Sequence, residues 1–372
     1  MNIKNVNPGS ETKKIRHQKK HTLKKTLLLL LIGISILCPI FSQDIHYSQF
    51  YNAPLTLNPA LTGIFKGDIR LMGNYRSQWR AVPVKYLTVT GAADMKFINQ
   101  ATPKGFFSGG IVFHYDQAGY SKLNLSNLGL NVSYTQRLGE KIYATAGGQL
   151  GLNQRAFKTE ELTFNNQFDP GRGVYDPDLS TGENFPNTNN FFVDFAAGLN
   201  LRWQGHSDAE LVDRLDKRSK LDIGFGIFHL NEPNQSFLED AVVPLTMRYS
   251  TYAFGTLQIG KSFDLLGNFN GQFQNPYREL VVSGGGKLHL NRSLGKQLAV
   301  QLTAGYRFSD IGDGFIPALE VNYNNWKVGV SYDINVSDFN VATRRRGGLE
   351  VAIHYIITKV KPLPVFKICP LI

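Results

Sequence analysis

The sequence predicts an all-β protein, a transmembrane antiparallel β-barrel of about fourteen strands of the outer-membrane type. Three observations predict this fold class. Segments of ten or more residues alternate between apolar and polar side chains, such segments recur along most of the 372-residue chain, and short and long connections between them alternate. A tilted strand needs about 9–11 residues to cross a bilayer, so these segments are long enough to span one.

Residues 326–336 show the alternation most clearly. Successive side chains of a strand point to opposite faces, so every second residue shares a face. One face is apolar and holds Trp326, Val328, Val330, Tyr332, Ile334 and Val336. The other face is polar or glycine and holds Lys327, Gly329, Ser331, Asp333 and Asn335. Residues 122–137, 141–157 and 298–308 alternate in the same way, whereas residues 220–231 are less regular.

Taken in chain order, the candidate strands number fourteen, and an even number is expected for a bacterial barrel of this kind. They are residues 67–76, 85–97, 106–116, 122–137, 141–157, 191–204, 220–231, 247–260, 263–274, 279–291, 298–308, 314–323, 326–336 and 347–357. We therefore expect one barrel domain over residues 67–357, followed by a C-terminal tail over residues 358–372.

The connections between the candidate strands support the same count. Bacterial barrels pair short periplasmic turns with longer outer loops. If the first strand starts at the periplasm, the connections after even strands should be tight, and 138–140, 261–262 and 324–325 are. The longest connection, about 158–190, follows the fifth strand and falls outside the cell, while 205–221 is a longer periplasmic exception. Fourteen strands then place both termini in the periplasm.

Composition excludes several classes of function. The formal net charge is +11, but residues 1–43 hold eight basic residues and one acidic residue, which leaves 32 basic and 28 acidic residues in the remainder. This balance does not indicate a nucleic-acid-binding domain, which would be strongly basic. The mean hydropathy of −0.20 is uninformative, because alternation hides membrane strands from such averages. Only Cys38 and Cys369 occur, so neither a disulfide framework nor a cysteine metal site is expected.

The N-terminal 43 residues have the pattern of a secretory signal peptide. A basic region precedes the apolar run Leu27–Ile40, which is short for a membrane-spanning helix. Cleavage after Ser42 would leave residue 43 or 44 near the new N-terminus; an uncleaved signal anchor is the alternative. The localisation expected is the cell outer membrane.

Residues 44–66 fit neither a helical nor a strand period. Pro54, Asn58-Pro59 and Gly63 punctuate the segment, and its aromatic residues need somewhere to pack. We expect an irregular N-terminal segment in the barrel lumen or under its periplasmic mouth. A flexible leader is the alternative.

No pattern in the chain indicates catalysis, so we expect a non-enzyme without a cofactor or a metal. The histidines outside the leader are scattered, and no zinc-protease motif, nucleophile elbow or phosphate-binding loop occurs. Asp169-Pro170-Gly171 and Asp176-Pro177-Asp178 could suggest calcium, but turn chemistry is the better explanation of both.

Two stretches are candidates for partner binding. The long connection at about 158–190 carries four aromatic residues among asparagines and glycines, namely Phe164, Phe168, Tyr175 and Phe185. Long loops are usually functional or disordered, and the aromatic residues favour a binding surface. Arg344, Arg345 and Arg346 lie in the last outer loop, where they could touch lipopolysaccharide phosphates or an acidic partner, or form a solvated charge run.

Several motifs resemble the PorP/SprF family of type IX secretion outer-membrane proteins from Bacteroidota. They are SQFYNAPLTLNPALTG at residues 48–63, NYRSQW at 74–79 followed by Pro83, and YDQAGY at 115–120 after Gly109. The residues that match family positions are Asn58, Pro59, Ala60, Gly63, Arg76, Gln78, Trp79, Asp116 and Gly119. Trp79 could equally be an interfacial belt residue. The chain departs from the usual pattern at its end, because it continues past Tyr355 rather than stopping at an aromatic residue.

The resemblance implies a non-enzymatic role in type IX secretion. Such a barrel would bind or anchor a specific secreted cargo protein, such as a gliding adhesin, through the C-terminal secretion domain of that cargo. Its other implied partners are outer-membrane lipid and periplasmic components of the secretion system. Two alternatives stay open: a diffusion channel for small solutes, and a structural anchor that does not contact cargo.

Overall fold

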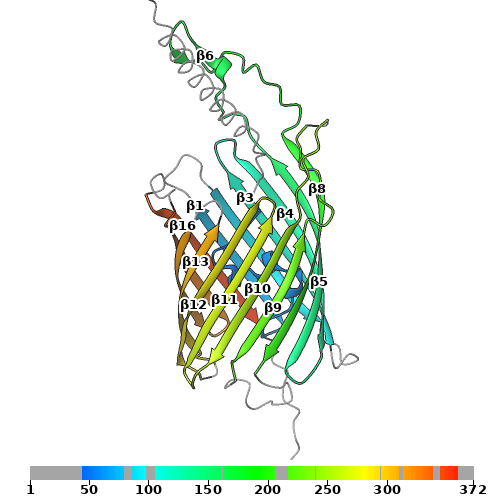
Figure 1. The fold of residues 1–372 in the computed structure, drawn as a ribbon, viewed down its shortest axis with the longest axis vertical. Coiled ribbons are helices and arrows are strands. Elements are labelled where there is room, and N and C mark those ends of the chain that lie inside the picture. Colours follow the sequence, from blue (N-terminus) through cyan, green and yellow to red (C-terminus); the bar gives the residue numbers. More distant parts are fainter. Residues whose placement is uncertain are drawn as a thin grey trace, which may run out of the picture. The chain divides into compact units, whose positions relative to one another are not determined.

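In the computed structural model, fourteen antiparallel strands form one closed barrel (Figure 1). The structure describes residues 44–78, 86–97, 105–160, 162–205, 217–238, 240–293, 295–309, 313–337 and 344–358. The barrel strands are β1 (Ile69–Gln78), β2 (Tyr86–Phe97), β3 (Gly105–Ala118), β4 (Leu123–Arg137), β5 (Ile142–Ala156), β8 (Asn189–Gln204), β9 (Lys220–Phe228), β10 (Arg248–Gln258), β11 (Phe263–Gln274), β12 (Tyr277–Asn291), β13 (Leu298–Ser309), β14 (Gly314–Tyr323), β15 (Trp326–Asn335) and β16 (Arg346–Ile357). The predicted fold class is therefore confirmed.

Each barrel strand pairs with its neighbours in sequence, and β1 pairs with β16 to close the barrel. The closing register joins Ile69 to Ile357 and Gln78 to Gly348. Strand boundaries differ from the expected ones by a few residues. The largest shift at a strand end is that of β9, which stops at Phe228 because His229 adopts a positive φ of 60° that a strand cannot continue.

Alternating side chains divide the barrel wall into an apolar outer face and a polar inner face. Along β15, Trp326 is 50% exposed and Val330 is 41% exposed on the outside, whereas Ser331 and Asp333 are 2% and 3% exposed on the inside. An apolar outer surface suits contact with lipid, and a polar inner surface is typical of such barrels. The pattern places most charged residues of the strands in the lumen.

The two ends of the barrel differ in their connections. One end, called the loop end here, carries the long connections 157–188 and 229–247. The opposite end, the turn end, carries the tight connections 138–141, 259–262 and 324–325, as well as the start of β1 and the end of β16. This arrangement matches the predicted alternation of short and long connections, except that the connection 275–276 at the loop end is tight and the connection 205–219 at the turn end is long.

Small elements lie outside the barrel wall. Three short helices precede β1: η1 (Phe50–Asn52), α2 (Pro54–Leu57) and η2 (Pro59–Leu61). In the connection after β5, the helix η3 (Asn165–Gln167) leads into a hairpin of β6 (Phe168–Asp169) and β7 (Val174–Tyr175).

The expected signal peptide lies outside the described residues, and so does the C-terminal tail apart from Thr358. Within the described part of the chain, no helix is both long enough and apolar enough to cross a membrane.

Candidate functional site

Residues 45–65, called the lumen segment here, lie inside the barrel (Figure 1). Phe50, Asn52, Asn58, Ala60 and Thr62 are completely buried. The segment is short and irregular, yet its polar atoms and apolar side chains meet strands on every side of the barrel. Its partners range from β1 and β2 through β8, β9 and β10 to β14, β15 and β16. A segment that contacts the wall all round its circumference occupies the lumen.

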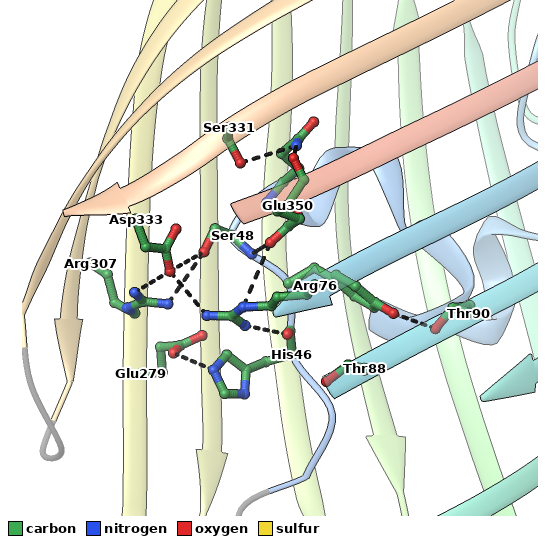
Figure 2. A network of polar contacts seen from close by, with 12 residues as sticks. His46, Ser48, Arg76, Thr88, Thr90, Glu279, Arg307, Ser331, Asp333 and Glu350 are labelled. Carbon is green, nitrogen blue, oxygen red and sulfur yellow. Dashed lines mark hydrogen bonds and ion pairs between the residues drawn. The ribbon is translucent and has the colours of Figure 1, made fainter. Parts of the chain in front are cut away.

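Two carboxylates bind the start of the lumen segment (Figure 2). Glu350 on β16 accepts hydrogen bonds from the backbone N–H of Ser48 at 2.8 Å and of Gln49 at 2.7 Å. Asp333 on β15 accepts a hydrogen bond from the Ser48 hydroxyl at 2.9 Å. Buried carboxylates need such donors, because an unpaired charge away from water is costly. The wall therefore provides acceptors where the segment lacks helical or strand partners.

Two arginines compensate these carboxylates (Figure 2). Arg76 on β1 lies 3.1 Å from Asp333 and 3.7 Å from Glu350, and it also donates to the backbone carbonyl of His46. Arg307 on β13 donates to Asp333 at 2.6 Å. All four charged side chains are nearly inaccessible to solvent. They form one buried network that joins four strands to the lumen segment.

Asn58 holds the middle of the lumen segment. Its amide nitrogen donates to the carbonyls of Leu199 on β8 at 2.9 Å and Phe225 on β9 at 3.1 Å. Its amide oxygen accepts from the Ala60 N–H at 2.8 Å and so caps η2, which begins at Pro59. An asparagine side chain can donate and accept at once, which explains why this residue type stands here.

Glycines in the wall let the backbone of the lumen segment approach closely. A Cβ atom added to Gly147 on β5 would lie 2.6 Å from the Ala60 nitrogen, and one added to Gly226 on β9 would lie 2.8 Å from the Leu57 carbonyl oxygen. A Cβ atom on Gly198 would overlap the Asn58 side chain. Glycine within a strand often marks such a close backbone approach.

The end of the lumen segment is bound near the turn end. Gly63 adopts a positive φ of 76°, and its N–H donates to Asp94 on β2 at 2.7 Å. Asp94 is also bound by Arg70 on β1 at 2.7 Å. The carbonyl of Phe65 accepts from Lys96 on β2.

The lumen segment therefore runs along the barrel from the loop end to the turn end. Ile45 is bound by Arg248, which stands at the loop end of β10, whereas Phe65 meets Lys96 at the turn end of β2. The end of β16, Ile357, also lies at the turn end. The described N-terminal end of the lumen segment and the C-terminal end of the barrel thus lie at opposite ends of the barrel.

Aromatic side chains gather in the connections of the loop end. Phe164 packs against Phe185 with ring centroids 5.9 Å apart, Phe185 against Phe157 at 5.7 Å, and Phe157 against Phe237 at 4.7 Å. The contact with Phe237 joins the connection after β5 to the connection after β9. Sequence reasoning missed Phe157 and Phe237, because each stands alone in its own stretch of sequence.

The β6–β7 hairpin exposes two of the predicted aromatic residues. Phe168 and Tyr175 face each other across the hairpin and are 53% and 43% exposed. Together with Phe157, Phe164, Phe185 and Phe237 they form what we call the loop-end aromatic surface. Gln167 orders the hairpin from inside, since its side chain is buried and binds the carbonyls of Pro177 and Leu179.

Asp169 at the hairpin tip behaves as a turn residue. One of its oxygens accepts from the Gly171 N–H at 2.8 Å, and Arg172 binds the other oxygen at 2.6 Å. These hydrogen bonds, first that of the Arg172 side chain and then those of the backbone N–H groups, hold the pKa of Asp169 below its usual value. Among the described residues, no three histidine, cysteine, aspartate or glutamate side chains are grouped so that they could hold a metal ion.

The structure does not bring the arginine cluster and the aromatic residues together in the part of the chain that it describes. Arg344 and Arg345 precede β16 and Arg346 begins it, and all three are exposed. The strands β1, β2, β3 and β4 separate β16 from β5 around the barrel. Arg344 and Arg345 adopt positive φ angles of 51° and 61°.

The other family positions have structural places. Arg76 joins the buried network, while Gln78 ends β1. Asp116 on β3 accepts from Thr88 at 2.6 Å, and Gly119 turns the chain with a φ of 70°. Trp79 lies outside the described residues.

The charged residues that bind the lumen segment were not predicted as a site. Glu279, Arg307, Asp333 and Glu350 each stand at an inward position of a different strand. A charge on the polar face of a predicted strand was the only available signal, and a polar inner face is expected of any such barrel.

Comparison with known proteins places the chain in a family. A search of curated proteins found no match. Among solved structures, the CymD monoaromatic hydrocarbon channel is similar at 9% identity with a TM-score of 0.47, covering 86% of this chain and 95% of that one. The toluene transporter TbuX of Ralstonia pickettii is similar at 10% identity with a TM-score of 0.46, covering 82% and 92%.

The toluene transporter TodX of Pseudomonas putida is similar at 10% identity with a TM-score of 0.43, covering 85% of this chain and 98% of that one. The sequence profile of a family described as type IX secretion system membrane protein PorP/SprF matches residues 40–355, which is most of the chain. The protein therefore belongs to the PorP/SprF family of type IX secretion system membrane proteins.

Proposed function

We propose that this protein is a non-enzymatic barrel that holds a specific secreted protein at the cell surface through its loop-end aromatic surface. The observation that carries this proposal is the loop-end aromatic surface itself, which combines exposed aromatic rings with an ordered backbone. Aromatic side chains dominate binding energy at protein interfaces because they bury a large area at a low cost in conformational entropy. The cargo would be a protein with a C-terminal secretion domain.

The connections of the barrel support one orientation in the membrane. Short turns of bacterial barrels lie in the periplasm and long loops lie outside the cell. The turn end and the end of β16 would then be periplasmic, where components of the secretion system would meet the barrel. Ile45 would lie towards the outside, so only the C-terminal end keeps the periplasmic place expected from the sequence. Removal of residues 1–43 as a signal peptide is part of the same proposal.

Because the lumen segment fills the barrel, binding of a secreted protein is favoured over passage of small solutes through the lumen. The lumen segment contacts strands on every side, and its buried network uses the charged groups that would otherwise line a pore. A diffusion channel would need this segment to leave, which would expose Asp333, Glu350 and their arginines without their present partners. Charged groups in this network already have structural partners, which gives no support to catalysis.

Recovery of cargo with a tagged barrel tests the proposal. We expect Phe168→Ser/Tyr175→Ser to reduce the amount of one large secreted protein recovered from solubilised outer membranes, as measured by mass spectrometry. Tyr120→Ser is the matched control, because Tyr120 is 57% exposed in a different connection of the loop end. Deletion of residues 160–188 should abolish recovery.

Two results would overturn the proposal. Cargo recovery that survives deletion of residues 160–188 would favour a structural anchor that does not contact cargo. Ion conductance by the purified barrel in planar bilayers, with no cargo recovered, would favour the diffusion channel.

A further inference from the structure

Besides Lys96, which binds the lumen segment, lysines on β9, β12 and β15 face the lumen close to its turn end. Lys220 begins β9, Lys287 lies towards the turn end of β12, and Lys327 lies near the start of β15. Side chains two residues apart share a face. Lys220 therefore shares one face of β9 with Asp222, which is buried inside the barrel. Lys327 shares one face of β15 with Ser331, which binds Gln49 of the lumen segment. These ammonium groups face the lumen and not the surrounding lipid.

The carboxylates of this half of the lumen already have cationic partners. The pairs are Asp94 with Arg70, Asp222 with Arg202, Asp264 with Arg218, and Glu320 with Lys327, and a ring nitrogen of His289 also lies 2.7 Å from Asp264. The ammonium groups of Lys220 and Lys287 form no hydrogen bond or ion pair with the residues that the structure describes. The charges that act on Lys220 include the cations Arg202, Lys327 and Lys287 and the carboxylate of Asp222, so positive neighbours outnumber negative ones. A bound anion would relieve this repulsion.

Solvent reaches these lysines from the turn end. Lys220 is exposed, and the neighbouring inward residues Thr256 and Leu266 are partly exposed. Nearer the loop end of the same strands, Ser250 and Asn270 are completely buried. The lumen segment therefore seals the loop-end half of this wall and leaves the turn-end half accessible.

The positive charge continues to the rim of the barrel. Lys261 and Lys296 are exposed in the turns after β10 and β12. The turn with Lys261 is held in place, because the Lys261 carbonyl accepts from Arg218 at 3.1 Å and the Ser262 carbonyl accepts from the His289 N–H at 2.8 Å. Lys287 lies about 13 Å along β12 from the end of that strand at about 3.3 Å per residue. The row of lysines from Lys287 to the rim is therefore longer than one inorganic anion, and its length matches about four residues of an extended peptide.

We propose that the turn end of the lumen binds an acidic peptide segment of a periplasmic partner, with Lys220 and Lys287 as its innermost contacts. The inference rests on the proposed orientation, which makes the turn end periplasmic. Ammonium groups bind carboxylates as point charges with three donors each, without the fixed geometry of arginine, and so suit a segment of variable sequence. A lipid headgroup in the bilayer is excluded as the ligand, because these side chains face the lumen.

Binding of a labelled acidic peptide to the purified full barrel tests this inference. The probe is a fluorescein-labelled peptide with six glutamates, and its fluorescence anisotropy reports binding at low salt. We expect Lys220→Gln/Lys287→Gln to weaken binding about tenfold or more, since two charge-assisted hydrogen bonds are lost. Added salt should weaken binding to the unaltered barrel as well.

The matched control is Lys141→Gln/Lys158→Gln. This variant removes the same amount of positive charge, at Lys141 on the rim between β4 and β5 and at Lys158 in the connection after β5. We expect it to change the affinity for the peptide by less than about twofold, because exposed ion pairs contribute little binding energy. Heat-dependent gel migration shows whether each variant is folded. A six-glutamine peptide should not bind.

Equal weakening by both double variants would overturn the inference, because binding would then follow net charge alone. Displacement of the peptide by inorganic phosphate at an equal concentration would also overturn it in favour of a small-anion site. Cargo recovery separates this inference from the proposed function. If Lys220→Gln/Lys287→Gln binds the peptide normally while Phe168→Ser/Tyr175→Ser loses cargo, only the inference about the turn end fails.

Discussion

The lumen segment and the connection at residues 157–188 look alike in sequence and behave oppositely in the structure. Both are irregular, and both mix aromatic residues with asparagine, glycine and proline. The lumen segment is buried, and its polar atoms bind strands far away in sequence, as in the Gln49–Glu350 hydrogen bond. The connection binds mainly itself, as Gln167 does with Leu179, and exposes Phe168 and Tyr175.

The difference shows which irregular segment belongs to the fold and which is available to a partner. A buried irregular segment needs partners for its polar groups, because a buried polar group without a partner is costly. The lumen segment finds these partners both in its own short turns and in residues of many strands. The connection leaves its aromatic rings in solvent, where a second protein can cover them.

Removing one cation of the buried network should have the largest effect. Arg76→Ala leaves Asp333 and Glu350 with one fewer positive charge and leaves the His46 carbonyl without its donor. We expect a loss of about 3–5 kcal/mol in the free energy of unfolding, as is usual when a buried pair loses one partner. Chemical unfolding in detergent, followed by tryptophan fluorescence, measures it. Lys158→Ala, at an exposed site, should cost less than about 0.5 kcal/mol. Equal losses would show that the network contributes nothing specific.

Two adjacent glycines give a sharper test of lumen packing. Gly147→Val should cost about 1–3 kcal/mol through overpacking, because its Cβ atom meets the Ala60 backbone at 2.6 Å. Gly148 faces the other side of β5, and its Cβ atom would meet nothing nearer than the Ala196 carbonyl at 3.7 Å. The same unfolding measurement should therefore show little change for Gly148→Val. A similar cost at both positions would contradict the close approach of the lumen segment.

In the connection, a substitution should affect binding more than stability. Phe185→Ala removes ring contacts to Phe157 and Phe164. We expect cargo recovery to fall while the unfolding free energy of the barrel changes by less than about 1 kcal/mol, since exposed connections open independently of the strands. A drop in barrel stability as large as that of Arg76→Ala would erase the distinction between the two regions.

The smallest expected effect is a pH dependence of the hairpin tip. Arg172 and two backbone N–H groups hold the pKa of Asp169 below its usual value. Because the pKa of Asp169 is lower in the folded state, its ionised carboxylate stabilises the turn at pH values above the unfolded pKa of about 4. This stabilisation is lost as the pH falls through the folded pKa. Hydrogen exchange at the Gly171 and Arg172 amides, corrected for the intrinsic rate, should accelerate below about pH 4. Asp169→Asn should abolish the extra acceleration; a variant with the same pH profile would show that Asp169 plays no part.

Sequence patterns alone predicted the strands, their number and the two kinds of connection. This was possible because alternation and turns are local, as in residues 326–336, where each side chain's face follows from its neighbours. The aromatic connection was also visible, since Phe164, Phe168, Tyr175 and Phe185 lie close together in the chain.

Only the tertiary structure decided what fills the lumen and in which direction. Ser48 meets Asp333, and Asn58 meets Leu199 and Phe225, only after the barrel has closed. Such contacts join residues more than 140 positions apart, and neither partner carries a local pattern that identifies the other. The same closure determines which inward lysines form no ion pair within the described residues, because Asp222, Asp264 and Glu320 are bound by residues from other strands or turns.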